Sequence, residues 1–196
     1  MANILLASSS PYRKELLLRL GITFDTCSPE IDETSIKGEN AEQLVRRLAI
    51  EKSKALQDNY PDTLIIGSDQ VAVLGNEILT KPGDHATAIE QLKASSGKTV
   101  NFYTGLCLLN TATQQAQTDV ITYTVTFRQL NGNQIENYLR QEQPYNCAGS
   151  FKSEGLGVAL FEKMTGDDPS ALIGLPLIRL TTMLANEGVD ILGTSD

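Results

Sequence analysis

The fold is decided by one short stretch in the first half of the chain, Leu64-Ile65-Ile66-Gly67-Ser68-Asp69-Gln70. Branched apolar residues followed by turn-forming residues predict a buried strand that ends near Gly67. A carboxylate at the end of such a strand lies where open α/β sheets bind their ligands. We therefore expect Asp69 to face a pocket, as a metal ligand or as a proton acceptor. An aspartate that only begins a turn explains this stretch taken alone equally well.

Apolar periodicity on both sides of this strand predicts further strands and helices. Ile4-Leu5-Leu6-Ala7 predicts a first strand, and Ser10-Pro11 marks the start of a helix that ends near Gly21. A second helix begins near Asn40, where Gln43 completes a capping box. The remaining predicted elements are a hairpin through Gly75-Asn76, a helix that ends at Gly97, strands over 99–109 and 117–127, a helix that carries Ile135 and Leu139, and a helix after Pro176. This order predicts a mixed α/β protein whose sheet is not purely parallel, with a short, polar and frayed tail after Gly188.

Length and composition place the chain among ordinary globular proteins. Its 196 residues suit one domain or two small ones, and 41% are hydrophobic and 20% charged. No apolar stretch is long enough to span a membrane, and the first residues predict no secretory signal. The three cysteines, Cys27, Cys107 and Cys147, are scattered and form no metal-binding pair. A reducing, cytoplasmic location is therefore expected.

The net charge narrows the classes of ligand. A formal charge of −8 disfavours polymeric nucleic acid and anionic membranes as partners, because both attract basic proteins. A small phosphorylated ligand remains possible if a local cationic pocket or a divalent metal holds it. His85 is the only histidine, which argues against histidine-based triads and multi-histidine metal sites. Acid–base chemistry must then rest on carboxylates, lysines or metal-bound water.

The junction between the first strand and the first helix has the features of an anion site. It reads Ser8-Ser9-Ser10-Pro11-Tyr12-Arg13-Lys14, so hydroxyl and basic groups gather at a helix N-terminus. Free backbone N–H groups and the helix dipole favour an anion there, and an arginine can hold a phosphate through two parallel bonds. Ser8, Ser10 and Arg13 are therefore candidate phosphate-binding residues. A capped surface helix with solvated charges is the alternative.

Two lysines and an acidic cluster extend this candidate site. Lys52 follows Leu48 by one helical turn on the apolar stripe of the second helix, so it needs a charged partner or ligand unless its stem merely covers the core. Lys81 stands before a proline that fixes the backbone beside it. The acidic cluster that ends at Glu33 suits a hard divalent cation, which often binds one or two carboxylates plus substrate phosphates, although a solvated loop has the same composition. These residues predict a metal-assisted enzyme that acts on a small phosphate ester or anhydride.

Several motifs then resemble the Maf family of nucleoside triphosphate pyrophosphatases over nearly the whole chain. They are Leu6-Ala7-Ser8-Ser9-Ser10-Pro11-Tyr12-Arg13-Lys14-Glu15-Leu16-Leu17, Ile66-Gly67-Ser68-Asp69-Gln70-Val71, Lys81-Pro82, Tyr103-Thr104-Gly105-Leu106 and Gly174-Leu175-Pro176. The resemblance implies an inosine-triphosphatase-like α/β fold with a central mixed β-sheet flanked by helices, formed by residues 1–196 as a single domain with a polar tail over about 188–196. It also implies a homodimer that hydrolyses a nucleotide between its α and β phosphates. The resemblance further implies that a divalent cation, Mg²⁺ or Mn²⁺, is required, with Glu33 and Asp69 as its candidate ligands.

Three positions resemble the branch of the family that hydrolyses 7-methyl-GTP. Tyr12 and Gln70 stand where the thymidine- and uridine-triphosphate branch has arginine and threonine. Glu154 lies in a segment that, in that other branch, ends in glutamine and glycine. Methylation at N7 makes guanine cationic, and an aromatic ring attracts a cationic ring, so Tyr12 suits a stacking platform. The 7-methyl-GTP branch that the chain resembles has tryptophan at this position. A carboxylate can accept two guanine N–H groups at once, which makes Glu154 the candidate reader of the base.

Three other functions are weighed against this interpretation. The chain could hydrolyse other nucleoside triphosphates, pyrimidine or modified, or it could be a nucleotide-binding regulator of cell division and septum formation. The presence of Arg13, Lys52, Asp69 and Lys81 together favours turnover, and with it the clearing of modified nucleotides from the pool. An aspartate-nucleophile phosphatase is disfavoured because Val71 stands where that chemistry needs a second aspartate.

Overall fold

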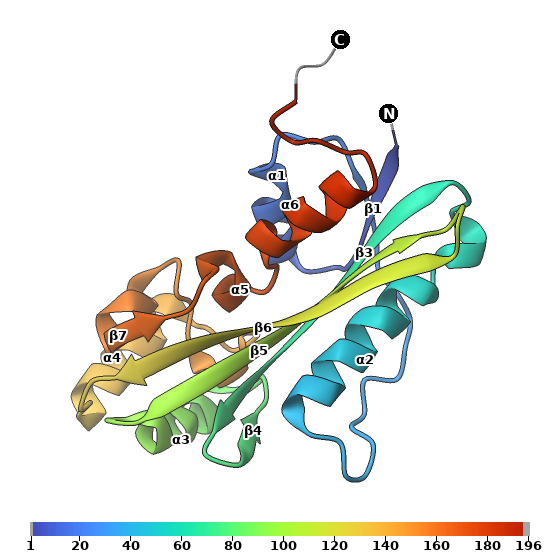
Figure 1. Ribbon diagram of the computed structural model, residues 1–196. Coiled ribbons are helices and arrows are strands. Elements are labelled where there is room, and N and C mark those ends of the chain that lie inside the picture. The colour runs from blue at the N-terminus through green and yellow to red at the C-terminus, as the bar shows by residue number, and fades with distance from the viewer. Residues whose placement is uncertain (1, 194–196) are drawn as a thin grey trace.

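The computed structural model describes residues 2–193, which form a curved sheet with helices on both faces (Figure 1). In chain order the elements are β1 (Asn3–Ala7), α1 (Pro11–Leu18), β2 (Asp25–Cys27), α2 (Ala41–Lys54), η1 (Gln57–Asn59), β3 (Thr63–Leu74), β4 (Glu77–Leu79), α3 (His85–Ser95), β5 (Thr99–Asn110), β6 (Gln115–Phe127), α4 (Gly132–Glu142), η2 (Ala148–Ser150), η3 (Leu156–Leu160), β7 (Phe161–Thr165), α5 (Pro169–Ile173) and α6 (Leu177–Asn186). The expected caps are present, because Ser10 caps α1 and the capping box of Asn40 and Gln43 opens α2.

The sheet is mixed, as the sequence predicts. Its seven strands follow the order β2-β1-β3-β5-β6-β7, with β4 paired to one end of β3. β1 is parallel to both β2 and β3, whereas β3, β5, β6 and β7 are successively antiparallel and β4 is antiparallel to β3. The parallel part and the long antiparallel part therefore meet in β3, the strand that carries Asp69.

The predicted end of this central strand is wrong. β3 continues through Asp69 as far as Leu74, because the antiparallel strand β5 supplies hydrogen-bond partners along its whole length. What ends near Gly67 is the other neighbour, since pairing with β1 stops at Ile66. Asp69 is thus an interior strand residue at the point where one side of the strand loses its partner, and the β1–α1 junction passes beside that opening.

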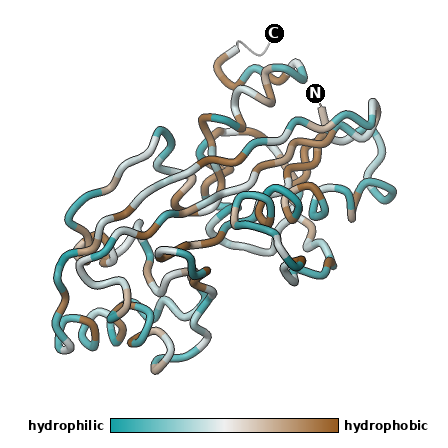
Figure 2. Tube along the Cα trace, turned by 60° about the horizontal axis from the view of Figure 1, so that its bottom comes forward, coloured by the Kyte–Doolittle hydropathy of each residue, from teal (hydrophilic) through white to brown (hydrophobic). Residues whose placement is uncertain are grey.

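The core lies on both faces of the sheet, and Figure 2 shows apolar colours recurring along the strands while the peripheral loops are polar. α2 covers one face, where Ala49 packs with Leu5 and Ile65. α1 and α6 cover the other, where Leu17 and Leu180 pack against neighbouring side chains. A third cluster fills the far end of the sheet with α3 and α4. It contains Phe102, Phe127, Phe151 and Phe161, whose rings pack edge to face.

Two strand glycines let α2 lie unusually close to the sheet. A Cβ atom at Gly67 would lie 2.1 Å from the carbonyl oxygen of Ala49, and one at Gly105 would lie 2.1 Å from that of Val45. Glycine in a strand often marks such a close approach of another backbone. The consequence is functional as well as structural, because this approach brings the side chain of Lys52 within reach of β3.

Short elements and boundaries account for the other differences from the sequence prediction. The first helix ends at Leu18 rather than near Gly21, and the strands β2 and β7 and the helix α5 were not predicted. The tail after Gly188 is not simply polar and frayed, since Val189 and Ile191 pack against the cluster beneath α6. Residues 194–196 of that tail lie outside the described residues.

None of the helices in the described part of the chain is long and apolar enough to cross a membrane.

Candidate active site

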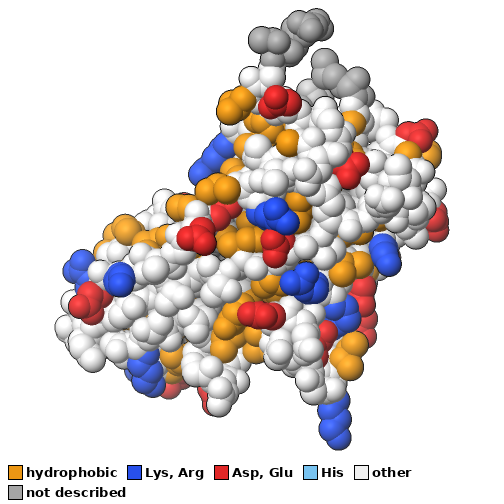
Figure 3. Space-filling view, viewed as in Figure 1, with side chains coloured by type: hydrophobic (Ala, Val, Ile, Leu, Met, Phe, Trp, Pro, Cys, Tyr) orange, Lys and Arg blue, Asp and Glu red, His pale blue; other side chains and the backbone are white. Residues whose placement is uncertain are grey.

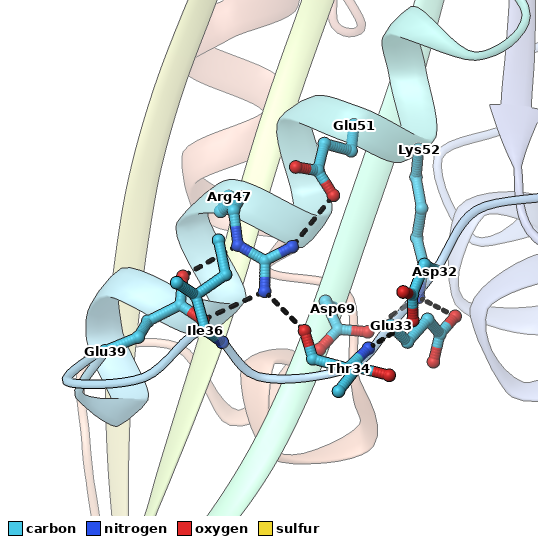
Figure 4. Close-up of polar contacts among 9 residues, drawn as sticks. All are labelled: Asp32, Glu33, Thr34, Ile36, Glu39, Arg47, Glu51, Lys52 and Asp69. Carbon is cyan, nitrogen blue, oxygen red and sulfur yellow. Dashed lines mark hydrogen bonds and ion pairs between the residues drawn. The ribbon is translucent and has the colours of Figure 1, made fainter.

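A buried ion pair between α2 and β3 forms the centre of the site. The Lys52 ammonium lies 2.6 Å from an Asp69 carboxylate oxygen and 2.8 Å from a Glu33 carboxylate oxygen, so one nitrogen joins two acidic groups (Figure 4). The side chains of Lys52 and Asp69 are only 8% and 11% exposed, whereas that of Glu33 is 57% exposed. Lys52 therefore faces inward to a charged partner and does not only cover the core with its stem.

The electrostatics of this centre favour the ionised form of Glu33. Partial burial raises the pKa of Glu33, but the hydrogen bond and the charge of Lys52, with help from the charges of Lys81 and Arg13, outweigh burial and hold that pKa below its usual value. Burial lowers the pKa of the Arg13 guanidinium, and the negative charges of Asp69 and Glu33 oppose that effect. Three cations, Arg13, Lys52 and Lys81, thus lie near the carboxylates of Glu33 and Asp69, and the opposite charges partly balance one another.

The β1–α1 junction brings Arg13 to this centre. Ser10 caps the helix by accepting the Arg13 backbone N–H at 3.4 Å, and Ser8 accepts both the Ser10 backbone N–H and a guanidinium N–H of Arg13. The Arg13 Nε donates to the carbonyl oxygen of Gly174 at 2.8 Å. The guanidinium is therefore held from two sides, which leaves its remaining donors oriented for a ligand.

The C-terminal carbonyls of α5 form the other wall, and they hold the residues on the far face of β3. Ser68 donates to the carbonyl of Gly174, while the Gln70 amide nitrogen donates to the carbonyls of Ala171 and Leu172 and to the Thr104 hydroxyl. Because side chains alternate along a strand, Gln70 and Asp69 point to opposite faces. Gln70 borders the pocket, but its amide nitrogen is committed to α5.

A cavity of about 940 Å³ opens above these groups. All ten residues singled out from the sequence line it, namely Ser8, Ser10, Tyr12, Arg13, Glu33, Lys52, Asp69, Gln70, Lys81 and Glu154. Their convergence from separated segments is what a ligand site requires, although the role of each residue stays a prediction. Elsewhere on the face of the molecule seen in Figure 3, acidic and basic side chains are interspersed rather than gathered by sign.

The other end of the cavity is formed by Tyr12 and the loop over 146–154. The Tyr12 hydroxyl lies 3.9 Å from the sulfur of Cys147, and burial, followed by the proximity of Cys147 and Glu154, raises the pKa of Tyr12 to about 12. Tyr12 is therefore a neutral phenol at physiological pH. Glu154 is exposed on the loop, where its carboxylate can meet a ligand without a prior protein partner except a weak contact with Ser153.

Several lining residues were not predicted from the sequence. Lys152 borders the pocket and forms an ion pair with Glu142 at 3.5 Å, and Phe102 and Phe151 supply apolar surface. Glu154 was expected in the loop over 146–154, but the loop sequence does not tell which of its other side chains turn inward. Ser68 and Thr104, both fully buried hydroxyls, carried no signal of their anchoring role.

The donor set fits a hard divalent cation only with a ligand's help. Glu33 and Asp69 offer carboxylate oxygens of the kind that magnesium prefers. Within residues 2–193, however, no group of three or more histidine, cysteine or acidic side chains is placed to hold a metal. A cation here would need further oxygens, and phosphate oxygens beside Arg13 and Lys81 are the natural source.

The fold and this site define an α/β protein with a polar, cation-lined pocket for an anionic ligand. A structure of the Ham1 protein of Staphylococcus aureus has a similar fold, with a TM-score of 0.52 over 94% of this chain and 99% of that one, at 15% sequence identity. The inosine-triphosphatase-like fold implied by the motifs is thereby confirmed.

The sequence places the protein more narrowly. Residues 3–187 match the profile of the family described as Maf-like protein, so the chain belongs to the Maf family. Relatives from Nitrosococcus oceani and Alcanivorax borkumensis are each 58% identical, over 96% of this chain and 95% of their own length. A relative from Pseudomonas aeruginosa is 54% identical over 97% of this chain and its whole length. All three carry the name 7-methyl-GTP pyrophosphatase.

Proposed function

We propose that the protein is a nucleoside triphosphate pyrophosphatase that hydrolyses 7-methyl-GTP to 7-methyl-GMP and pyrophosphate. The observation that carries this proposal is the buried pair of Lys52 and Asp69 in a pocket that Arg13 and Lys81 also line. A carboxylate held beside cations suits attack by water on a phosphoanhydride. The name shared by relatives at more than 50% identity supports the choice of substrate.

The proposed chemistry divides between the carboxylate and the cations. Asp69 accepts the proton of the attacking water, and its contact with Lys52 orients the carboxylate. Arg13, Lys52 and Lys81 neutralise the charge that grows on the pyrophosphate leaving group, aided by the hydroxyls of Ser8 and Ser10. Such interactions accelerate the reaction because they are stronger in the transition state than in the ground state.

Glu33 and Asp69 would hold the divalent cation, Mg²⁺ or Mn²⁺. When bound, the cation would supply positive charge that polarises the phosphoanhydride. Glu33 is suited to this role because it is exposed to the pocket and remains ionised, with its pKa lowered by Lys52. Lys52 would then share Asp69 with the cation and would hold the carboxylate in place until both the metal and the nucleotide arrive.

The base end of the pocket would set the selectivity. Tyr12 presents a neutral ring to a base that methylation has made cationic, which favours stacking. Glu154 would accept two N–H groups of the guanine edge, a pairing that thymine does not offer. Gln70 would act indirectly, because its amide nitrogen is bound to carbonyls of α5 and so fixes this helix beside the pocket.

The setting of the enzyme is proposed on the same basis. Residues 1–196 would work as a single domain in a cytoplasmic homodimer that clears methylated nucleotides from the pool. The small nucleotide is the partner that the pocket suits, and the acidic net charge of −8 disfavours polymeric nucleic acid.

One assay separates this function from the alternatives. The purified protein with Mg²⁺ or Mn²⁺ is incubated with 7-methyl-GTP, GTP, UTP and thymidine triphosphate, and pyrophosphate and orthophosphate are measured separately. Pyrophosphate released fastest from 7-methyl-GTP is the expected result. Faster release from a pyrimidine nucleotide would show that the protein prefers a pyrimidine substrate, as the other branch of the family does. Orthophosphate release would indicate a phosphatase, and tight binding without turnover would favour a nucleotide-binding regulator.

A further inference from the structure

The segment that delivers Glu33 to the site has little to hold it in place. Residues 28–40, here called the acidic loop, join β2 to α2, and none of them lies in a helix or strand. Every residue from Asp32 to Gly38 is exposed, including Ile36, which is 58% exposed. The burial of apolar surface therefore contributes almost nothing to the order of the part of the loop that carries Glu33.

A single arginine on α2 supplies the missing anchors (Figure 4). The Arg47 Nε and Nη2 atoms donate to the two carboxylate oxygens of Glu39, at 2.8 and 2.9 Å. Nη2 also donates to the Thr34 carbonyl at 3.0 Å, and Nη1 donates to Glu51 at 2.9 Å. Arg47 thus holds the acidic loop at Thr34 and at Glu39. Glu51, one turn along the helix, fixes the guanidinium itself.

The anchored atoms lie directly beside Glu33. The Thr34 carbonyl that Arg47 binds belongs to the next residue, and the Thr34 backbone N–H is bound by Asp32 at 2.9 Å. Glu39 in turn accepts the backbone N–H of Ile36 at 3.1 Å, so the main chain at Ile36 is also held. The main chain on the carboxyl side of Glu33 is therefore fixed, so the Glu33 carboxylate is already positioned against Lys52 before a ligand binds.

We propose that Arg47 is a positioning residue that holds the acidic loop against α2, so that Glu33 is presented to Lys52 and Asp69 before a ligand binds. The proposal rests on the proposed function in one respect only, that Glu33 takes part in turnover. Arg47 itself contacts neither Asp69 nor Lys52 and is absent from the pocket lining.

The competing interpretation is a surface ion pair without consequence, which is what most exposed pairs are. Three observations favour positioning. The side chains of Arg47 and Glu39 are only 19% and 9% exposed. Their contact is the two-pronged arginine–carboxylate pairing, which is geometrically specific. A further Arg47 contact goes to the main-chain carbonyl of Thr34, which an incidental pair of side chains would not restrain.

The test compares Arg47→Met with Arg46→Met, its matched control. Arg46 lies next to Arg47 on α2 and has the same charge, but within residues 2–193 its side chain makes a single hydrogen bond, at 3.3 Å to the half-buried Thr118. Hydrogen exchange of the peptides that cover the acidic loop is measured first, because it needs no substrate. Steady-state kinetics with 7-methyl-GTP follow, and kcat and KM are determined separately.

We expect Arg47→Met to speed exchange in the acidic loop by about tenfold or more, because the loop opens locally once its anchors are lost. The rest of the sheet should keep its protection, and kcat should fall by about tenfold up to ~10²-fold, as for other losses of orientation. Arg46→Met should match the wild type in both measurements. Glu39→Gln, which breaks the same pairing from the loop side, should reproduce the pattern of Arg47→Met in weaker form.

Arg47→Lys guards against a variant that fails to fold. Lysine keeps the charge and the stem but cannot form the two-pronged pairing, so loop exchange should still rise. Loop exchange equal to that of the wild type in both Arg47→Met and Arg47→Lys would overturn the proposal, as would a uniform rise in exchange across the sheet. Faster loop exchange with unchanged kcat would show that the loop is anchored as described but that its order does not serve turnover, which would also overturn it. A protein that turns over no nucleotide contradicts the proposed function and leaves the exchange result to decide whether Arg47 anchors the loop.

Discussion

Replacing Asp69 by asparagine should damage stability and turnover together, because the carboxylate is paired with Lys52 and is the proton acceptor that we propose for the reaction. The Asp69→Asn side chain keeps its shape and one oxygen acceptor but loses the charge that faces Lys52 at 2.6 Å. Lys52 is 8% exposed, so its ammonium would remain buried after its closest partner became neutral. Removing one partner of a buried pair costs about 3–5 kcal/mol, because an uncompensated charge stays behind.

The structure places the expected loss near the lower end of that range. Glu33 remains 2.8 Å from the Lys52 ammonium, but it is 57% exposed and so compensates only in part. A loss of about 3 kcal/mol lowers the melting temperature of a chain of this size by roughly 6–12 °C, at about 2–4 °C per kcal/mol. Turnover should fall by at least ~10²-fold, the usual scale for an acid–base residue.

Urea unfolding of the wild type and of Asp69→Asn measures the first effect, and pyrophosphate release measures the second. The double variant Lys52→Met with Asp69→Asn serves as the control, because it removes the stranded charge and should recover part of the stability but none of the activity. Wild-type stability in Asp69→Asn would refute the buried pair as described. Near-wild-type turnover in the folded variant would refute the role of Asp69 in catalysis.

Substitutions at four further positions test other parts of the site and its packing. Lys52→Ala should lower kcat by about 10²-fold with a smaller change in KM, because its charge acts mainly on the leaving group; a change in KM alone would reduce Lys52 to a binding residue. Glu154→Gln should lower the preference for 7-methyl-GTP over UTP by roughly 5- to 150-fold, the worth of a paired hydrogen bond to a base, and unchanged ratios would remove Glu154 as the base reader. Tyr12→Ala should compress the preference for 7-methyl-GTP over GTP, whereas Tyr12→Trp should keep or increase it. Gly67→Ala should cost about 3 kcal/mol or more in unfolding experiments, because the new Cβ would lie 2.1 Å from the carbonyl oxygen of Ala49 and must displace α2; a thermal midpoint within error of the wild type would contradict this packing.

The elements that the sequence predicts well are those with local signals. Ser10 before Pro11, and Asn40 three residues before Gln43, mark the helix starts because capping depends only on neighbouring residues. The hairpin through Gly75 is equally local. The inward direction of Lys52 was predicted from its place on an apolar stripe, and the structure confirms it with Asp69 as the partner.

What the sequence could not supply depends on pairing between distant segments. The neighbours of Asp69 in sequence predict the end of a strand there, but β5 extends β3 to Leu74 by pairing with residues more than 25 positions away. Gln70, expected at the site from the family resemblance, does line the pocket. Its amide nitrogen, however, binds carbonyls of α5, a helix of five residues that is too short to give a periodic signal. The role of Arg47 was equally hidden, because its partners lie in a loop without periodicity.

The two ends of the pocket differ in what holds them, and this difference bears on how the enzyme selects its substrate. The phosphate end rests on β3 and α2, whose close packing at Gly67 fixes Lys52 against Asp69. The proposed base end rests on a loop, and the carboxylate of Glu142, the last residue of α4, accepts the Leu156 backbone N–H at 2.7 Å and so holds the segment that carries Glu154. Loops accept substitutions that strands beneath a packed helix do not. A change of base preference can therefore arise in the loop while the hydrolytic centre stays intact, which is why the selectivity ratios and the rate of turnover must be measured as separate properties.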